Sequence, residues 1–310
     1  MDLTIIGIDI AKAQFDVFEL NGQNHTIRPN SPQGIKSLIK DLTKLGDCQV
    51  IFEATGRYHK NLERALDKAE IAYSCVNPWQ ARRFAEAMGK RAKTDKVDAK
   101  MLALMGQALQ LDPTVLRDEV IEMLGEYELL RLGLVHERTS WRNREQILSN
   151  KTFKKIAGKQ IKQIEKDLTA LEAKAISEVK AHPELQERFT ILKTIPGIGP
   201  TTALSLLITM PELGSLSEKK VGALAGLAPM DRQSGTYQGK AHIRGGRSSV
   251  RKALFMPALV AIRYNPNLKT FYERLTNAGK PKKLAVTAVM RKLLVIANAL
   301  IREQRNWKPN

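Results

Sequence analysis

Short apolar runs and amphipathic segments alternate over the first hundred residues. Residues 1–20 hold two β-type runs, with isoleucines on both sides of Asp9, and Asn21-Gly22 follows as a hairpin turn. The periodicity then predicts a helix at 34–45, a strand at 49–53, a helix at 62–69, a strand at 73–76 and a helix at 94–109. Hairpin strands followed by alternating helices and strands indicate a mixed α/β sheet.

Between about 116 and 183 the sequence is charged and nearly free of Gly and Pro, and its apolar positions take helical spacing. Two sets recur at steps of three and four residues: Val120, Met123, Tyr127, Leu130 and Leu134, and then Ile161, Ile164, Leu168, Leu171 and Ala175. Both an antiparallel helical hairpin and an intermolecular coiled coil fit sets this short. Either arrangement predicts a spacer or assembly arm.

Past residue 192 the pattern changes to helical segments separated by Gly and Pro. IPGIGPTTA separates two of them, a flexible Gly/Ser/Arg-rich loop is expected within 226–249, and basic helices are expected near 248–263 and 283–302. Arg291 and Lys292 interrupt the apolar part of the last helix, which favours a buried amphipathic helix over a membrane span.

A length of 310 residues is about twice that of a typical domain. The changes in pattern predict an α/β domain over 1–112, a helical arm over 113–185 and a mainly α domain over 186–310. Cys48 and Cys75 lie in apolar runs without metal-ligand spacing, so we expect reduced thiols and no zinc site. The start of the chain lacks the pattern of a secretory signal, which favours a cytoplasmic protein.

The charge of the chain indicates its partners. Hydrophobic residues make up 43% and charged residues 26%, which is ordinary for a folded protein and excludes a largely disordered one. The net charge is +18, and residues 235–310 alone hold 16 Lys and Arg against 2 Asp and Glu. Cationic surfaces bind polyanions by counterion release, so nucleic acid is the expected partner.

Four carboxylates form the main candidate site. Asp9 interrupts an apolar strand, Glu53 ends another, and Asp95 and Asp98 share one face of a helix. Oxygen ligands without His or Cys suit Mg²⁺, and four carboxylates suit two ions that act on the attacking and leaving oxygens of phosphoryl transfer. Each acid taken singly also fits a structural role, such as a helix cap or a partner of a lysine. Their joint occurrence in a basic α/β protein favours the metal site.

A second candidate site lies near the Gly-rich loop after residue 192. IPGIGPTTA resembles a helix–hairpin–helix, in which backbone N–H groups, here at Gly197 and Gly199, face a DNA phosphate. A Pro-Gly loop between two core helices is the alternative.

Hydroxyl groups and cations gather downstream, around His242. The predicted nucleic-acid contacts there are Lys240, Arg244, Arg247 and Arg251. A hydroxyl among guanidinium groups has the ingredients for attack on a phosphate, since the cations stabilise the developing charge. The chemistry leaves several candidate nucleophiles open, which are Ser234, Thr236, Ser248 and Ser249. It equally allows a turn serine beside phosphate-binding arginines.

Five ordered motifs give the chain a family likeness over nearly its whole length. They are GIDIAKAQFDV, EATGRY, NPWQARRFAEAMGKRAKTDKVDAKMLA, IPGIG and the AGLAP…SG…RKALFMPA block. The chain resembles the transposases of the insertion sequence 110 family and the related pilin-gene-inverting recombinases.

The resemblance implies a RuvC-like, ribonuclease-H-type N-terminal domain whose DEDD tetrad falls on Asp9, Glu53, Asp95 and Asp98. It implies a coiled-coil arm and a C-terminal transposase domain whose catalytic serine falls on Ser234. Mg²⁺, donor and target DNA, a structured bridge RNA that pairs with both, and a homo-oligomer (dimer or tetramer) are implied as cofactor and partners. In such an oligomer, different protomers can contribute the carboxylates and the serine.

These observations predict a site-specific DNA transposase that forms a covalent link between Ser234 and DNA. A metal-only nuclease of the Holliday-junction-resolvase type is one alternative, with Ser234 only binding phosphate. A non-enzymatic nucleic-acid-binding protein, which would work in EDTA, is the other.

Overall fold

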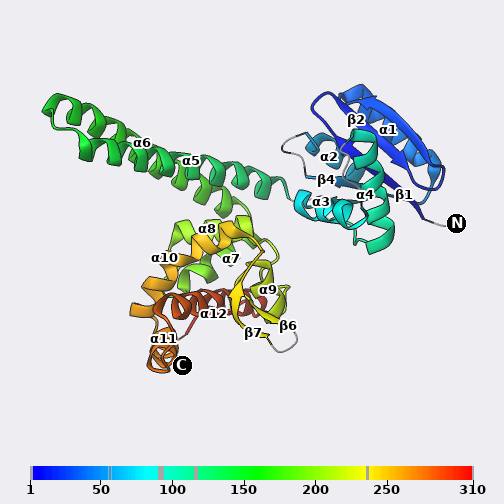
Figure 1. The fold of residues 1–310 in the computed structure, drawn as a ribbon. Helices are drawn as coiled ribbons and strands as arrows, with labels where there is room; N and C mark the ends of the chain where they lie inside the picture. Colours follow the sequence, from blue (N-terminus) through cyan, green and yellow to red (C-terminus); the bar gives the residue numbers. More distant parts are fainter. Residues whose placement is uncertain are drawn as a thin grey trace. The chain divides into compact units, whose positions relative to one another are not determined.

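The structure is a computed structural model that describes residues 3–54, 56, 58–89, 94–114, 118–234 and 237–308, with backbone only at 232–234, 237, 238 and 240. The chain forms two compact units, Met1–Arg117 and Asp118–Asn310. The first unit is α/β and the second is mainly helical (Figure 1). The fold classes predicted for the two ends of the chain are therefore confirmed.

A five-stranded sheet with the order β3-β2-β1-β4-β5 lies at the centre of the first unit. Its strands are β1 (Thr4–Ile10), β2 (Gln14–Glu19), β3 (Asn24–Pro29), β4 (Cys48–Glu53) and β5 (Ala72–Val76). The first three are antiparallel neighbours, and the predicted turn at Asn21-Gly22 joins β2 to β3. β4 is parallel to both β1 and β5.

Helices cover both faces of the sheet. α1 (Pro32–Leu45) and α2 (Lys60–Lys68) pack against alternate residues of β1, including Ile6 and Ile8. α4 (Asp95–Leu109) packs on the opposite face, in a core that contains Ile5. This division follows from the two-residue period of a strand. A further helix that the hydrophobic pattern did not predict, α3 (Pro78–Ala87), has no fully buried residue to mark it.

The backbones of β1 and α4 approach each other closely at Gly7. A Cβ atom at Gly7 would lie 2.0 Å from the carbonyl oxygen of Ala99 and 2.5 Å from the amide nitrogen of Ala103. The start of α4 is fixed by Thr94, whose hydroxyl accepts from the backbone N–H of Val97 at 3.3 Å. The absent side chain of Gly7 therefore sets the depth at which α4 lies on the sheet.

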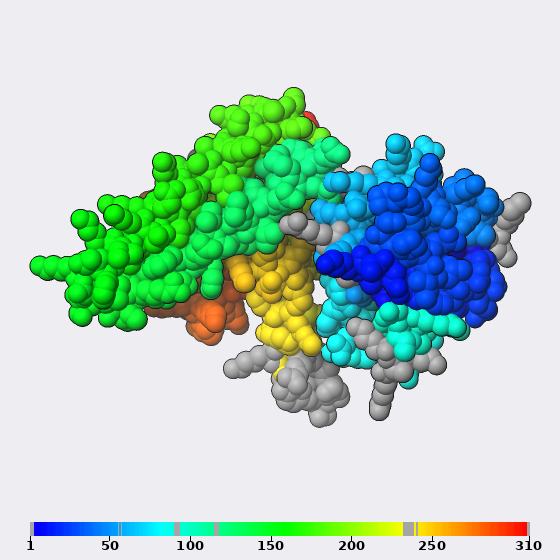
Figure 2. Space-filling view, turned by 90° about the horizontal axis from the view of Figure 1, so that it is seen from above, coloured from blue at the N-terminus to red at the C-terminus, as the bar shows by residue number. Residues whose placement is uncertain are grey.

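The second unit begins with an antiparallel helical hairpin, α5 (Glu119–Ile147) and α6 (Lys151–Ala181), which lie side by side in Figures 1 and 2. Asn150 caps α6, because its side chain accepts from the first N–H groups of that helix. Arg142 and Glu165 form an ion pair of 2.7 Å between the two helices. Of the two predicted arrangements, the structure shows the hairpin.

The predicted heptad seam holds along α6 but not along α5. Ile161, Ile164 and Ala175 are buried, whereas Leu130 is 54% exposed and Met123 is 36% exposed. The prediction of a regular apolar seam along α5 is wrong at these two residues. The reason is that α5 packs against α8 as well as α6, so its buried surface is not a single stripe.

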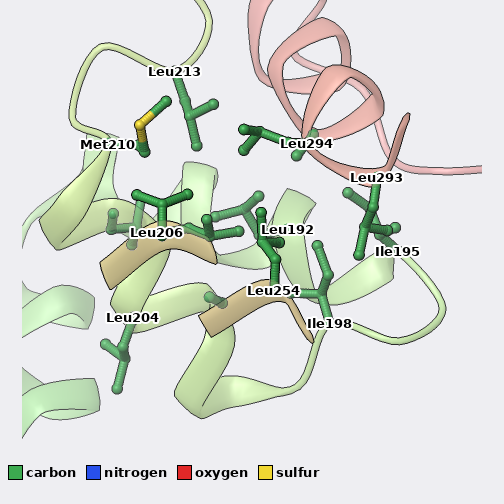
Figure 3. Packing of buried hydrophobic residues seen from close by; sticks show 14 of the residues in the cluster. Leu192, Ile195, Ile198, Leu204, Leu206, Met210, Leu213, Leu254, Leu293 and Leu294 are labelled. Carbon is green, nitrogen blue, oxygen red and sulfur yellow. The ribbon is translucent and has the colours of Figure 1, made fainter. Parts of the chain in front are cut away.

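A helical body completes the second unit. Its helices are α7 (Pro183–Thr194), α8 (Pro200–Thr209), α9 (Glu218–Leu224), α10 (Ser248–Tyr264), α11 (Pro266–Asn277) and α12 (Lys282–Arg302). Figure 3 shows their shared core, where Leu192, Leu206, Leu254 and Leu293 meet from four of these helices and are fully buried. α11 had not been predicted.

Within the helical body, α12 is the element predicted to be a buried amphipathic helix. Among the described helices, it alone is long and apolar enough by length and composition to cross a membrane. In the fold, 56% of its most apolar window is buried, including Leu293 and Leu294 in the shared core. The prediction of a core helix is confirmed.

A two-stranded antiparallel hairpin, β6 (Pro229–Ser234) and β7 (Tyr237–Ile243), lies between α9 and α10. The prediction of a flexible loop over this stretch is wrong for the residues in the two strands. Its Gly, Ser and Arg content is typical of a loop, but the backbone groups of the two segments pair with each other, and composition does not reveal that pairing.

Replacing Gly7 with alanine should lower the free energy of unfolding by about 2–4 kcal/mol, because the new Cβ overlaps the backbone of α4. Gly125→Ala in α5 is the matched control. Its Cβ would meet nothing within 4 Å, so a gain of about 0.5–1 kcal/mol is expected from helix propensity. Urea unfolding followed by circular dichroism measures both, and an unaltered stability of Gly7→Ala would contradict the close packing.

Candidate carboxylate site and serine hairpin

The sheet and α4 bring the four predicted carboxylates to one region of the first unit. Asp9 lies two residues beyond Gly7 and therefore on the sheet face that α4 covers. Glu53 ends β4, the parallel neighbour of β1, two residues after Ile51, which packs in the core beneath α4. Asp95 and Asp98 occupy the first turn of α4.

The charges of the other three acids act on Asp9. The pKa of Asp9 is raised from 3.8 to about 6, first by burial and then by the negative charges of Asp98, Asp95 and Glu53. A negative charge raises the pKa of a neighbouring carboxyl group in this way only at short range. The positive end of the α4 dipole partly offsets the repulsion between the two acids of its first turn.

The donor set fits a hard divalent cation. It consists of carboxylate oxygens alone, and a cation would relieve the repulsion that raises the pKa of Asp9. Over the described ranges, no group of three or more His, Cys, Asp or Glu side chains is arranged closely enough to ligate one ion. The structure therefore brings Glu53, Asp95 and Asp98 within electrostatic range of Asp9, but among the described residues it does not place the four as a ligand shell.

Asp16 is a fifth acid in this region that the sequence analysis missed. It lies directly opposite Asp9 on β2 and is only 4% exposed. His25 contacts one of its carboxylate oxygens at 2.8 Å, and the side-chain amide of Gln14 donates to the other at 3.1 Å. Its charge also raises the pKa of Asp9. Asp9 and Asp16 are seven residues apart in the sequence, and only the antiparallel register brings them together.

Ser234 lies at the end of β6, where the hairpin closes on Tyr237. The side chains of Ser234 and Lys240 lie outside the described part of the structure, and so does Thr236. The strand register shifts between Met230 and Arg232, a bulge of the kind that increases strand twist. The backbone thus places the predicted nucleophile at the tip of an ordered ladder in the second unit.

The predicted arginine contacts fall into two classes. Arg244, just beyond β7, and His242, within β7, are both exposed. Arg247 instead donates to both carboxylate oxygens of Glu212, and Arg251 donates to two backbone carbonyls. The first class faces solvent, whereas guanidinium groups of the second class have partners within the chain.

The two predicted phosphate-binding glycines also differ. Gly197 has a positive φ of 105°, and a Cβ there would lie 2.7 Å from the carbonyl oxygen of Pro257 in α10. Gly199 is exposed, with open space around the position of a Cβ, at the cap of α8. Close packing against α10 requires glycine at the first position, and only the second leaves room for a ligand.

Asp9→Asn should stabilise the protein at pH 8 in EDTA. A carboxyl whose pKa rises on folding holds its proton more tightly in the folded state, so stability falls as the pH rises from about 4 to 6. After allowance for partial solvent exposure, removal of this charge should add about 1–2 kcal/mol at pH 8 and only a small part of that at pH 4. Urea unfolding at both pH values measures the difference.

Asp112→Asn, which alters an exposed acid of the same unit, is the control and should give no such gain. Equal stabilities of wild type and Asp9→Asn across this pH range would contradict the electrostatic coupling.

Comparison with known proteins assigns the chain to a family. A DEDD-type transposase model of insertion sequence IS110 matches residues 6–153, and a model described as the transposase IS116/IS110/IS902 family matches residues 189–273. The pilin gene-inverting proteins of Moraxella bovis and Moraxella lacunata are each 34% identical over 323 residues, covering 98% of this chain and 98% of their own.

Two partial matches accompany these. An uncharacterized 43.6 kDa protein of insertion element IS110 from Streptomyces coelicolor is 31% identical over 136 residues, covering 43% of this chain and 33% of its own length. T. thermophilus RuvC in complex with a Holliday junction substrate matches at 12% identity and a TM-score of 0.28, covering 36% of this chain and 100% of its own; a likeness this weak decides neither fold nor function. On the full-length matches, the chain belongs to the IS110 family of transposases and is an enzyme of the DNA transposase and recombinase class.

Proposed function

We propose that the protein is a site-specific transposase that cuts and rejoins DNA by Mg²⁺-dependent phosphoryl transfer, with Ser234 as the nucleophile. The observation that carries the proposal is the placement of four acids in one region: Asp9 on β1, Glu53 at the end of β4, and Asp95 and Asp98 in the first turn of α4, whose charges contribute to the raised pKa of Asp9. Within an enzyme of this family, a cluster of acids on one face of a sheet supports a metal site. The proposal includes a ribonuclease-H-type, RuvC-like fold for the N-terminal unit.

Asp9, Glu53, Asp95 and Asp98 would hold the metal, which we take to be two Mg²⁺ ions. When bound, Mg²⁺ supplies positive charge to the oxygens of a scissile phosphate. The chain itself supplies the position: β1 and β4 carry two ligands on a rigid sheet, and the first turn of α4 carries the other two. The repulsion among these acids supports cation binding, because the cation replaces an unfavourable interaction with a favourable one.

Ser234 would carry the DNA strand during exchange. Its hydroxyl oxygen attacks the phosphorus and loses its proton. The bond between the phosphorus and a deoxyribose oxygen then breaks, and that oxygen takes up a proton. Attack by a deoxyribose hydroxyl of the second DNA then reverses the step and releases the serine. The position of Ser234 at the end of a paired strand supports this role, because an ordered backbone holds a nucleophile in place.

The partners that we propose are donor and target DNA, a structured guide RNA and further copies of the chain. The 16 basic and 2 acidic side chains of residues 235–310 support binding of nucleic acid. The exposed Arg244 and the open cap at Gly199 are the contacts that fit a phosphate best. The two Moraxella relatives are named for inversion of a gene, a reaction that joins two DNA sites, and we propose the same type of strand exchange here.

Ser234→Ala should reduce recombination by roughly a thousandfold or more, because the covalent step loses its nucleophile. Ser249→Ala is the matched control: it removes a hydroxyl from the start of α10 and should leave recombination intact. A suicide DNA substrate, followed by mass spectrometry of the protein, measures the adduct directly. A metal-only nuclease would still cleave with Ser234→Ala and would form no adduct, and that result would overturn the serine mechanism.

RNA that copurifies with the full-length protein should be one defined structured species if a guide RNA directs site choice. Sequencing of that RNA, with a charge-matched basic protein from the same cells as control, measures the enrichment. A mixture of abundant cellular RNAs in both samples would contradict the guide RNA and leave only non-specific binding to the basic surface.

A further inference from the structure

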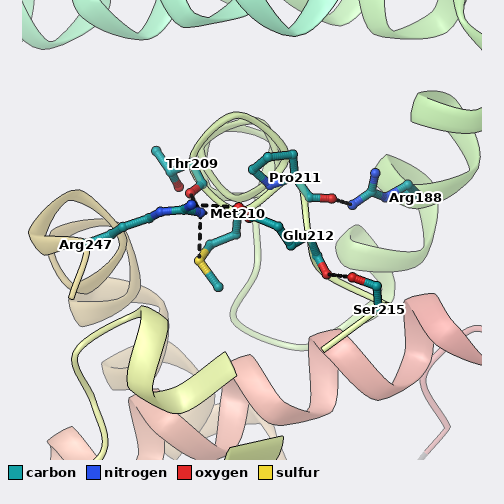
Figure 4. Close-up of polar contacts among 7 residues, drawn as sticks. All are labelled: Arg188, Thr209, Met210, Pro211, Glu212, Ser215 and Arg247. Atoms are coloured by element: carbon teal, nitrogen blue, oxygen red, sulfur yellow. Dashed lines mark hydrogen bonds and ion pairs between the residues drawn. The ribbon is translucent and has the colours of Figure 1, made fainter. Parts of the chain in front are cut away.

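An ion pair joins the base of the β6–β7 hairpin to the helical body. Arg247, the last residue before α10, donates through Nη1 and Nη2 to the two carboxylate oxygens of Glu212, at 2.7 and 2.6 Å. Its Nη1 also donates to the backbone carbonyl of Thr209 at 2.8 Å. Figure 4 shows the guanidinium lying against the end of α8 and the loop that follows. Arg247 thus makes a bidentate pair together with a backbone contact, a geometry that a lysine does not reproduce.

The loop that accepts Arg247 is itself held on two other sides. Arg188 of α7 donates to the backbone carbonyl of Pro211 at 2.7 Å (Figure 4) and to that of Leu213 at 3.1 Å. Asn298 of α12, which is 1% exposed, accepts from the N–H of Gly214 and donates to the carbonyl of Leu216. Contacts from α7 and α12 therefore hold the loop over residues 211–216, and Arg247 is attached to a supported segment.

The two legs of the hairpin, which are the segments 224–226 and 245–247 that flank its strands, pack closely against each other. A Cβ at Gly226 would lie 2.1 Å from the carbonyl oxygen of Gly245, and a Cβ at Gly246 would lie 2.2 Å from the amide nitrogen of Gly226. Nη1 of Arg251 bridges the legs, because it donates to the carbonyls of Ala225 and Gly245. The backbone N–H of Arg247 donates to Leu224 at 2.8 Å. A movement of Arg247 therefore moves both legs.

We propose that Arg247, held by Glu212, is a positioning residue that fixes the β6–β7 hairpin, and with it Ser234, on the helical body. Arg247 acts through protein contacts, unlike the exposed Arg244, which is free to meet a phosphate. The link to catalysis rests on the proposed function of Ser234, whereas the mechanical anchoring of the hairpin does not.

The experiment compares Arg247→Gln, Glu212→Gln and Arg244→Gln in the full-length protein. Hydrogen exchange of peptides from 229–243 should become roughly tenfold faster in the first two variants and stay unchanged in Arg244→Gln, because only the first two break the charged pair. The salt dependence of DNA affinity should be unchanged in Arg247→Gln, whereas a lost phosphate contact should lower the slope by about 0.9 in Arg244→Gln.

The cleavage rate at saturating DNA should fall about tenfold or more in Arg247→Gln, with the DNA affinity retained. Arg247→Lys should not restore it, since an ammonium group does not make the bidentate pair. The exchanged pair Glu212→Arg with Arg247→Glu should restore part of the hairpin protection and of the rate.

Three results would overturn the proposal. They are a lowered salt slope in Arg247→Gln, hairpin exchange that stays at the wild-type rate in both pair-breaking variants, and exchange that rises equally in α8 and α12, which would mean general destabilisation. If the wild type cleaves DNA without a Ser234 adduct, the proposed function fails, and hydrogen exchange still decides whether Arg247 anchors the hairpin.

Discussion

The close approach of α4 to β1 at Gly7 is the contact on which the carboxylate site depends. Asp9 follows Gly7 by two residues on the same face of the sheet, and the first turn of α4 brings Asp95 and Asp98 to that face. A side chain at Gly7 would overlap backbone atoms, which cannot move aside as a flexible side chain can. Because glycine is the one residue without a Cβ, the helix lies deep enough for charges on two elements to interact.

The acids around Asp9 make its ionisation unfavourable. Burial contributes most to the raised pKa of Asp9, which is about 6, and the charges of Asp98, Asp95, Glu53 and Asp16 add to it. Such an arrangement reduces the stability of the ionised protein and increases the gain from a bound cation. Gln14 and His25 engage both carboxylate oxygens of Asp16, so Asp16 contributes its charge to the region while its oxygens are held by neighbouring side chains.

In the second unit, Arg244 has a different environment from Arg247 and Arg251, although all three lie within eight residues. Arg244 faces solvent, whereas Arg247 donates to the carboxylate of Glu212 and Arg251 donates to the carbonyls of Ala225 and Gly245. A high density of positive charge in a sequence therefore indicates a nucleic-acid partner for the surface as a whole, but it does not assign a phosphate to each side chain. The same holds for Gly197, whose missing side chain makes room for α10.

Particular helices and strands show which parts of the fold the sequence pattern predicts. Strong patterns predicted β1, β4, α4 and the two basic helices, since the two strands are runs of buried apolar residues that an acid interrupts or ends, and the helices bury apolar residues at helical spacing. It missed α3, which buries no residue completely, and it took the β6–β7 stretch for a loop.

For the candidate site, the sequence alone predicted Asp9 and Glu53, because an acid in or at the end of an apolar run is unusual, and Asp95 and Asp98, because their spacing places them on one face of a helix. Only the tertiary structure decided that Asp16 joins them, since strand register brings together residues that share no sequence pattern. Only the tertiary structure separated Arg247 from Arg244, because whether a charge faces solvent or a partner depends on packing between distant segments.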